Sequence, residues 1–427
     1  MKRSRRATSK SSEKKIKTLA LALLSLVMPA AAHSRSDDRL GLSGSVRAAE
    51  WERNKSMSSD RGFSVGSVWL QARPQEIAGL KPFFDARLQA QNLSRTGDSA
   101  ADVREAFVET SLGSFDLKVG RQITVWGRAD KANPTDVWSS RDYGLLMVDD
   151  EDQRLGAAAA QAVWNVGGFR LIGLWQPEWR SPQYPVSGLP AGITLQNGDP
   201  ANPAGQFGLK LDRSGGDLDW SVSYSSAIDR TPDLRVLSSG TSGTSLQFAY
   251  NRIDVLGGDL AKNFGDFGFR GEGAYVRTGD ASGTDPLVKN SFVYLVAGFD
   301  RSFWSDLNVN AQFLYRHAFD YRAAGEISDP SLQYLAKQAQ IFSNQKDADY
   351  DAASLRADYK AFHETFDVEV ALIGWFNNGL IRPKATYAFT DALKGSVGAE
   401  LYRGNDDSFF GRLREASSVF SEVRYLF

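Results

Sequence analysis

The densest group of side chains that could do chemistry lies between residues 119 and 154. Its charges are of both signs and stand close together along the chain. The residues singled out are Arg121, Arg128, Asp130, Arg141, Asp149, Asp150, Glu151, Asp152 and Arg154. Facing groups of opposite charge create a transverse field that sorts solutes by polarity and size. The segment therefore predicts a pore constriction, with residues 127–153 folded into a lumen. An exposed loop held by its own salt bridges is the alternative.

One of these residues conflicts with the local pattern. Strict alternation places Arg121 on the same face as Ile123 and Val125, which would meet lipid. A bulge or flexibility at Gly120 would turn Arg121 inward instead. We keep Arg121 among the expected constriction residues on that condition.

The run Asp149-Asp150-Glu151-Asp152 offers carboxylate oxygens, which are the ligands that calcium prefers. The run lacks the alternate-residue spacing and the glycine of a calcium loop, so a solvated acidic loop tip is the favoured interpretation. The chain has no cysteine, which excludes thiolate metal sites and thiol nucleophiles. We expect neither a metal nor a cofactor.

Hydrolytic chemistry has little support. A catalytic nucleophile needs a base within hydrogen-bond reach, and the chain has only 3 histidines, His33, His317 and His363. His33 adjoins an expected cleavage site, and the other two fall at opposite ends of predicted strands. No serine stands in a Gly-x-Ser-x-Gly turn. The chain is predicted not to be an enzyme.

The elements that must position the charged groups are strands. Leu307, Val309 and Ala311 share one face of a segment whose other face carries Asn308 and Asn310, and this period of two dominates from residue 40 onward. The predicted strands span residues 40–51, 62–73, 80–92, 102–112, 116–126, 154–165, 168–176, 205–213, 217–227, 245–263, 266–278, 290–301, 305–317, 350–360, 364–376, 379–390, 392–403 and 415–427.

These strands predict an all-β fold, a single antiparallel transmembrane β-barrel. The segments are about 10–13 residues long, which suits tilted membrane strands better than the strands of a soluble sandwich. Apolar faces would meet lipid and charged faces would line a wet lumen. We expect about 18 strands, with 16 as the alternative, joined by short turns at one end and long loops at the other.

The polar strand faces supply candidate lumen residues of mixed sign. They are Asp85, Arg87, Glu105, Glu109, Lys118, Lys210, Arg270, Glu272, Arg316, Arg356, Arg382, Lys384 and Glu400. Balanced charges on the walls argue against a strongly anion-selective or cation-selective pore.

The two ends of the chain carry export signals. Residues 1–32 have a basic start, a short apolar stretch and an Ala-Ala-Ala sequence, which predicts a cleaved signal peptide followed by one barrel domain, 33–427. The last strand ends with Tyr425 and Phe427 on one face, the pattern expected of an assembly signal. Lys+Arg 50 against Asp+Glu 51 leaves no basic excess for nucleic acid. We expect an integral protein of a bacterial outer membrane.

The chain resembles a group of uncharacterised proteobacterial outer-membrane β-barrels with a porin-like character. The resemblance covers most of the mature chain and is carried by VGRQ (119–122), WGRAD (126–130), NPTD (133–136), RDY (141–143), DQR (152–154), PLVKN (286–290), RPK (382–384), YRG (402–404) and SFFGRL (408–413). It implies the barrel fold and supplies no functional residues.

The function expected is a porin-like channel for passive diffusion of a small polar or amphipathic solute. One alternative is a plugged barrel that serves as the outer-membrane component of a lipid or polysaccharide export system. A barrel-borne hydrolase is the least supported alternative. The expected partners are outer-membrane lipid and lipopolysaccharide, the barrel-assembly machinery and further copies of the chain, with no nucleic acid.

Overall fold

The structure is a computed structural model, and it describes residues 39–53, 62–91, 99–130, 132–184, 191–240, 243–304 and 306–427. The predicted signal peptide and His33 lie outside the described residues.

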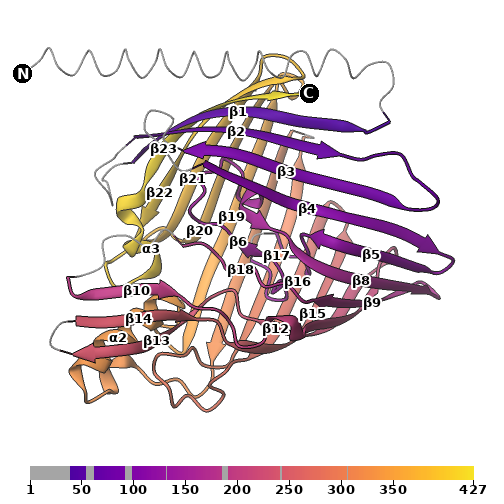
Figure 1. The fold of residues 1–427 in the computed structure, drawn as a ribbon. Coiled ribbons are helices and arrows are strands. Elements are labelled where there is room, and N and C mark those ends of the chain that lie inside the picture. The colour runs from indigo at the N-terminus through magenta and orange to yellow at the C-terminus, as the bar shows by residue number, and fades with distance from the viewer. Residues whose placement is uncertain are drawn as a thin grey trace, which may run out of the picture.

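The described residues form a closed antiparallel β-barrel of 18 strands (Figure 1). Each strand pairs with its neighbour in the chain, and β1 closes the ring by pairing with β23, from Ser45 opposite Leu426 to Arg53 opposite Ser418. The strands are β1 Leu42–Arg53, β2 Gly62–Ala72, β3 Lys81–Gln91, β4 Ser99–Leu112, β5 Phe115–Gln122, β8 Ala157–Val166, β9 Phe169–Gln176, β11 Gln206–Arg213, β12 Asp219–Ile228, β15 Arg252–Phe264, β16 Phe267–Arg277, β17 Phe292–Phe303, β18 Leu307–Ala318, β19 Asp349–Ala361, β20 Phe366–Trp375, β21 Asn378–Ala388, β22 Leu393–Arg403 and β23 Ser418–Leu426.

Side chains alternate between the two faces of the barrel wall. On β3, Phe84 and Leu88 are exposed, whereas Asp85, Arg87 and Gln89 are buried. A soluble protein would bury the large apolar side chains and expose the charged ones, because exposing large apolar groups to water is unfavourable. The wall is therefore apolar outside and polar inside, as the period of two predicts.

The predicted count of 18 strands is confirmed, and one predicted strand is wrong in extent. The expected strand 245–263 is two strands, β14 Gly243–Ala249 and β15, which are separated by Tyr250 and Asn251. Only β15 belongs to the barrel, because β14 pairs with β10 Ile193–Asn197 and β13 Asp233–Gly240 in a separate sheet.

The two ends of the barrel differ. At one end, turns as short as 113–114 and 265–266 join the strands, and Gly113 and Gly265 adopt φ of +63° and +61°, which favour glycine. At the other end, residues 123–156, 177–205, 229–251 and 319–348 form long connections. This asymmetry is typical of outer-membrane barrels.

The long loops build a cap with its own apolar core (Figure 1). The cap combines the small sheet of β10, β13 and β14 with helix α2 Pro330–Phe342, whose N-cap is Asp329. Leu335 and Ala336 of the helix pack with Leu246 and Phe248 of β14 in one buried cluster. The helix therefore packs on neighbouring loops. The remaining short elements are β6 Ser140–Arg141, η1 Asp150–Gln153, β7 Arg154–Leu155, η2 Pro203–Gly205, η3 Ala324–Glu326, α3 Phe409–Arg412 and η4 Arg414–Ala416.

Within the described part of the chain, no helix is both long enough and apolar enough to cross a membrane.

Candidate functional site

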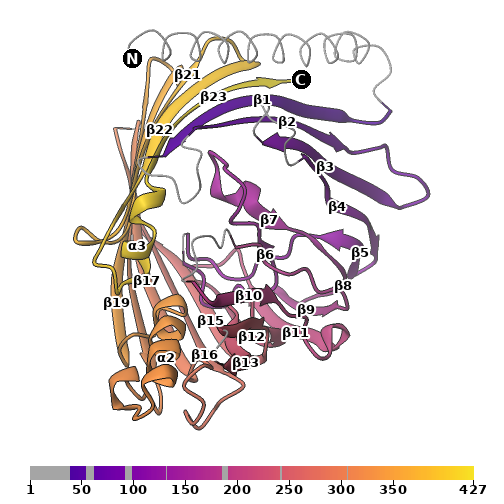
Figure 2. The ribbon, with the colours of Figure 1, turned by 60° about the vertical axis from the view of Figure 1, so that its left-hand side comes forward.

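The inner loop, defined as residues 123–156 between β5 and β8, runs inside the ring of strands. Figure 2 shows its short strands β6 and β7 within the barrel. The side chains that it contacts come from inward faces of strands far away in sequence. The loop is therefore fastened by the barrel wall, and its anchors define the site.

The first anchor is Arg128, which reaches acidic groups of the wall. Its guanidinium donates to the carboxylate of Asp212 on β11 at 2.6 Å and to that of Asp259 on β15. Both carboxylates are buried, and Lys210 lies 3.5 Å from Asp259. A buried carboxylate is costly unless it is paired, so the loop's arginine offsets part of the cost of burying both groups.

The second anchor is Glu272 on β16. Its buried carboxylate accepts hydrogen bonds from the backbone N–H groups of Arg128, Ala129 and Thr135, at 3.0, 3.0 and 2.8 Å. The hydroxyl of Thr135 adds a further bond at 2.8 Å. Charge-assisted bonds of this kind are about twice as strong as neutral ones. Glu272 thus fixes the conformation of the loop's first turn.

The third anchor is the loop tip, which meets basic groups of the wall. Arg382 on β21 donates to the carbonyls of Met147 and Val148 at 2.9 and 2.7 Å and to the carboxylate of Asp150. Asp149 lies 2.9 Å from Arg424 on β23. The acidic tip is therefore neutralised by wall arginines.

Further tip contacts come from neighbouring strands. Asp152 pairs with Arg47 of β1 at 2.5 Å, and its carbonyl accepts from Arg87 of β3 at 3.0 Å. Burial opposes ionisation of Asp149, but the attraction of Lys384 and Arg424 outweighs it and lowers the pKa of Asp149 to about 2. Asp149 stays ionised at neutral pH because its ionised form is the one that is bound.

The two groups of anchors lie on opposite walls. Strand β15, which carries Asp259, is nine pairings from β1, which carries Arg47, and the ring has 18 strands. The loop therefore bridges wall carboxylates on one side, where Lys210 and Arg270 also lie, and wall arginines on the other.

Eight of the nine expected constriction residues join this loop network. Asp130 accepts from Arg270 of β16 at 2.6 Å. Arg154 pairs with Asp136 at 2.7 Å and also with Glu151, which Arg141 contacts at 3.0 Å. Their role in setting the width of a pore stays a prediction.

The placement of Arg121 among them is wrong. Its guanidinium pairs with Glu178 of the next long loop at 2.6 Å, and it shares the face of the exposed Val119. Gln122, the next residue, is the one buried on the inward face. The alternation thus holds through Gly120 despite its φ of +134°.

The candidate lumen residues lie among inward-facing groups, mostly paired across neighbouring strands. Those that contact the inner loop are Arg87, Glu105, Arg270, Glu272, Arg382 and Lys384. Those with other partners are Asp85 with Arg104, Lys118 with Glu109, Lys210 with Asp259, Arg316 with the carbonyl of Ser343, Arg356 with Glu369, and Glu400 with Arg382.

Sequence reasoning missed several residues of the network, including Arg47, Asp212, Asp259 and Arg424. They obey the same alternation and could have been found by extending it to every strand. Arg104 is different, because a register shift opposite Asp85 and Ala86 places an extra residue in β4 and lets Arg104 bond Asp85 at 2.9 Å. Alternation alone does not predict such a bulge.

The described residues contain no group of three or more acidic or histidine side chains arranged to hold a metal ion. His317 lies at the long-loop end of β18, 2.8 Å from Asp349, and His363 lies in a turn at the other end.

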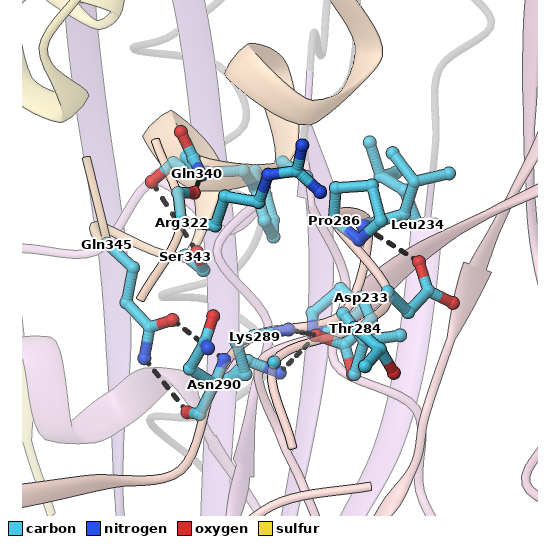
Figure 3. Close-up of a pocket in the computed structure, with 17 residues that line it drawn as sticks. Asp233, Leu234, Thr284, Pro286, Lys289, Asn290, Arg322, Gln340, Ser343 and Gln345 are labelled. Atoms are coloured by element: carbon cyan, nitrogen blue, oxygen red, sulfur yellow. Dashed lines mark hydrogen bonds and ion pairs between the residues drawn. The ribbon is translucent and has the colours of Figure 1, made fainter. Parts of the chain in front are cut away.

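A second polar cluster lies in the cap, beside a small cavity (Figure 3). The buried amine of Lys289 lies 2.8 Å from Asp233 and 2.9 Å from Asp229 and donates to the carbonyl of Thr231 at 2.7 Å. Burial opposes its charge, but the two carboxylates raise the pKa of Lys289 to about 12. The next residue, Asn290, exchanges two backbone bonds with the side chain of Gln345. The segment 286–290 thus ties two long loops together.

Comparison with known proteins finds one family and several similar solved structures. A family model described as "Protein of unknown function (DUF1302)" matches residues 52–425. No curated protein sequence matches the chain. Among solved structures, the chain is similar to a mutant of the Rhodopseudomonas blastica porin, with 12% identity, 91% of this chain and 100% of that chain covered, and a TM-score of 0.41. The chain is also similar to a loop-deletion mutant of OmpT, an outer membrane protein of Vibrio cholerae. The identity is 13%, the match covers 90% of this chain and 98% of that chain, and the TM-score is 0.43. A third similar structure is Salmonella typhi OmpF in complex with daunomycin. The identity is 11%, the match covers 91% of this chain and 97% of that chain, and the TM-score is 0.45.

Proposed function

We propose that this chain, which belongs to the family described as protein of unknown function (DUF1302), is an outer-membrane, porin-like channel for passive diffusion of a small polar or amphipathic solute. The observation that carries the proposal is the inner loop, which bridges wall carboxylates and the arginines of the opposite wall inside a closed barrel. Charged groups on facing walls would orient a solute that has both a polar and an apolar part. The mixed charges favour weak ion selectivity.

The apolar outer face supports membrane insertion. Leu88, Val119, Leu256 and Val397 are each more than half exposed, and they lie on strands all around the ring. Lipid is the environment in which such a face is stable. We propose outer-membrane lipid and lipopolysaccharide as its surroundings, the barrel-assembly machinery as its partner during insertion, and further copies of the chain as oligomer partners. No catalytic turnover is expected.

The experiment that tests the proposal is single-channel recording of the purified barrel in a planar bilayer. Steady conductance steps are expected, with a small reversal potential under a salt gradient. Replacing residues 127–153 with a short Gly-Ser linker should enlarge the steps. A correctly folded barrel that stays silent with and without this segment would contradict an open channel.

A second candidate is a plugged component of a lipid or polysaccharide exporter. Attachment of the inner loop to opposite walls favours it, because the same contacts that would narrow a pore would also block it. This candidate predicts silence of the intact barrel and conductance only after the segment is removed. Single-channel recording therefore separates the two functions.

A further inference from the structure

Two parts of the inner loop are attached to the barrel wall in different ways. The root, residues 126–138, lies against the wall strands from β8 to β16. The tip, residues 145–152, lies against β1 to β4, β21 and β23. The kind of attachment determines which part can leave the wall.

The root interlocks with the wall. Trp126 and Trp138 are buried in one apolar cluster, whose wall members are Ala159, Val163, Ile172, Leu174 and Ala227. Gly208 of β11 makes room for both indole rings, because a Cβ there would lie 2.6 Å from a ring atom of Trp126 and 2.5 Å from one of Trp138. A Cβ at Gly257 of β15 would collide with the methyl group of Thr135 in the same way. Lifting the root would therefore expose this cluster to water, which is unfavourable.

Lifting the root would also leave a buried charge without partners. Within the described residues, the hydrogen bonds to the carboxylate of Glu272 all come from the root, as the N–H groups of residues 128, 129 and 135 and the hydroxyl of Thr135. Glu272 is buried, and removing the partners of a buried charge is strongly destabilising. The root is therefore a fixed part of the barrel.

The wall beneath the tip depends on the loop much less. Five of its cations keep a carboxylate of the wall itself as a partner, namely Arg87 with Asp102 at 3.7 Å, Arg104 with Asp85 at 2.9 Å, Arg382 with Glu400 at 3.2 Å, Lys384 with Glu369 at 3.8 Å and Arg424 with Glu422 at 2.8 Å. Arg47 pairs with Asp152 of the tip, and its guanidinium carbon also lies 4.2 Å from the ring centre of Trp69. Departure of the tip would thus leave most wall cations paired.

The carboxylates of the tip are already partly in water. The side chains of Asp149, Asp150 and Glu151 are 40%, 35% and 67% exposed, so full hydration requires little further change. The apolar contacts of the tip oppose its departure, since Leu145 and Met147 pack on Trp69, and Val148 packs in a separate cluster on β1, β2 and β23. The docked tip is therefore the predominant state, and the undocked tip is the minor one.

The tip can move as one unit because it has contacts of its own. The short strands β6 and β7 pair at its base. The side chain of Gln153 donates to the carbonyl of Leu145 at 3.1 Å, and Arg141 donates to the carbonyl of Asp150 at 2.8 Å. These bonds do not involve the wall, so they survive undocking.

We propose that the tip is a gate, which undocks from the wall as one unit while the root stays fixed. Undocking opens the lumen between residues 145–152 and the inward faces of β1, β2 and β23. Ion pairs that water reaches are weakened by salt, so the undocked state should become more populated as the ionic strength rises. The inference goes beyond the channel proposal, because it applies to an open barrel and to a plugged one.

Two buried serines of the wall form a matched pair for the test. Ser67 of β2 is 4% exposed and lies between Val65 and Trp69, which both contact the tip. Ser225 of β12 is 2% exposed and is paired with Gly208 beneath the root. The chain has no cysteine, so Ser67→Cys and Ser225→Cys each introduce a single thiol.

The measurement is the rate at which a water-soluble maleimide modifies each thiol of the folded protein in lipid nanodiscs. Ser67→Cys should react about tenfold faster than Ser225→Cys, which corresponds to a difference of about 1.4 kcal/mol in the free energy of opening. Raising the salt concentration from about 0.1 M to about 1 M should accelerate the reaction of Ser67→Cys alone. Asn308→Cys, exposed on the inward face of β18, shows that the reagent enters the lumen.

Weakening the ionic contacts of the tip provides a second arm. Asp149→Asn together with Asp150→Asn should accelerate the modification of Ser67→Cys about tenfold further and leave that of Ser225→Cys unchanged. Asp406→Asn removes a carboxylate from an exposed pair with Arg414 and is the control, which should change neither rate.

The outcomes separate the gate from the channel proposal. Equally slow modification of both thiols in every condition overturns the gate, and so does equal acceleration of both, which would mean that the whole loop leaves the wall. Modification does not require ion conduction, so a silent barrel with a reactive Ser67→Cys contradicts the open channel alone. A conducting barrel with an unreactive Ser67→Cys contradicts the gate alone. If Ser67→Cys does not fold, Ser45→Cys, buried opposite Trp69 on β1, provides the same test.

Discussion

The amine of Lys289 lies 2.8 Å from the carboxylate of Asp233, although 56 residues separate them in the chain. Both side chains are almost completely buried, and they join the loop after β16 to the loop that carries β13. The pair lines the small cavity of the cap (Figure 3), and Leu234 and Leu287 of the apolar core line the same cavity. The cap is therefore held by an ionic contact as well as by apolar packing.

Lys289→Met should loosen the cap and leave the barrel intact. The change leaves the buried Asp233 and the partly buried Asp229 without their lysine, and removing one partner of a buried pair costs about 3–5 kcal/mol. Limited proteolysis should cut residues 229–251 much faster in the variant, while the barrel keeps its resistance to heat in detergent. Lys337→Met removes an exposed amine from the same cap and is the control. Equal cleavage of both variants would contradict a special role for Lys289.

Glu272→Gln should release the start of the inner loop. The neutral side chain loses charge-assisted bonds to the N–H groups of Arg128, Ala129 and Thr135. Bonds to charged groups contribute about 1.5–3 kcal/mol, so amide exchange in residues 128–135 should accelerate by about tenfold to a hundredfold. Glu109→Gln removes a half-exposed wall carboxylate and should leave this exchange unchanged. Unchanged exchange in Glu272→Gln would show that other contacts hold the loop.

The sequence predicts the inward groups well where a strand keeps its period of two. Asp85 and Glu272 could be placed in the lumen from alternation alone, and both are buried there. Alternation could not separate β14 from β15, because Leu246 and Phe248 follow the same pattern as a barrel strand. Only the choice of partner, β10 and β13 in place of a barrel neighbour, distinguishes them.

Contacts between residues far apart in the chain could not be predicted from the sequence either. Arg128 was expected to lie at a constriction, but its partners Asp212 and Asp259 are 84 and 131 residues away. Nothing local to residue 128 indicates them, since strand order around the ring determines which wall faces the loop. Arg121 lies outside the lumen because the alternation continues through Gly120 and leaves Gln122 as the buried inward residue.

The docking of the loop tip should depend on pH only in strong acid. The folded pKa of Asp149, about 2, lies below the ordinary value of 3.8, so the ionised form favours the docked tip. This contribution is fully present above the ordinary value and is lost as the pH falls through about 2. The part of the single-channel conductance that depends on Asp149 should therefore be constant from neutral pH to about pH 4 and change below it. Asp149→Asn should lack this step, and a step in the wild type well above pH 4 would assign the change to another group.

Phe427→Ala should reduce assembly of the barrel more than its stability. The backbone of Phe427 bonds that of Gly44 in both directions, at 2.9 and 3.1 Å, and these bonds survive the substitution. The aromatic ring is the part that we expect the assembly machinery to recognise, so the amount of heat-resistant barrel in outer-membrane fractions should fall several-fold. Val423→Ala truncates an apolar residue of the same face of β23 and is the control. Equal amounts of the two variants in the membrane would show that Phe427 is not part of the assembly signal. A loss of thermal stability in Phe427→Ala that matches the loss of assembly would show that the effect comes from barrel closure.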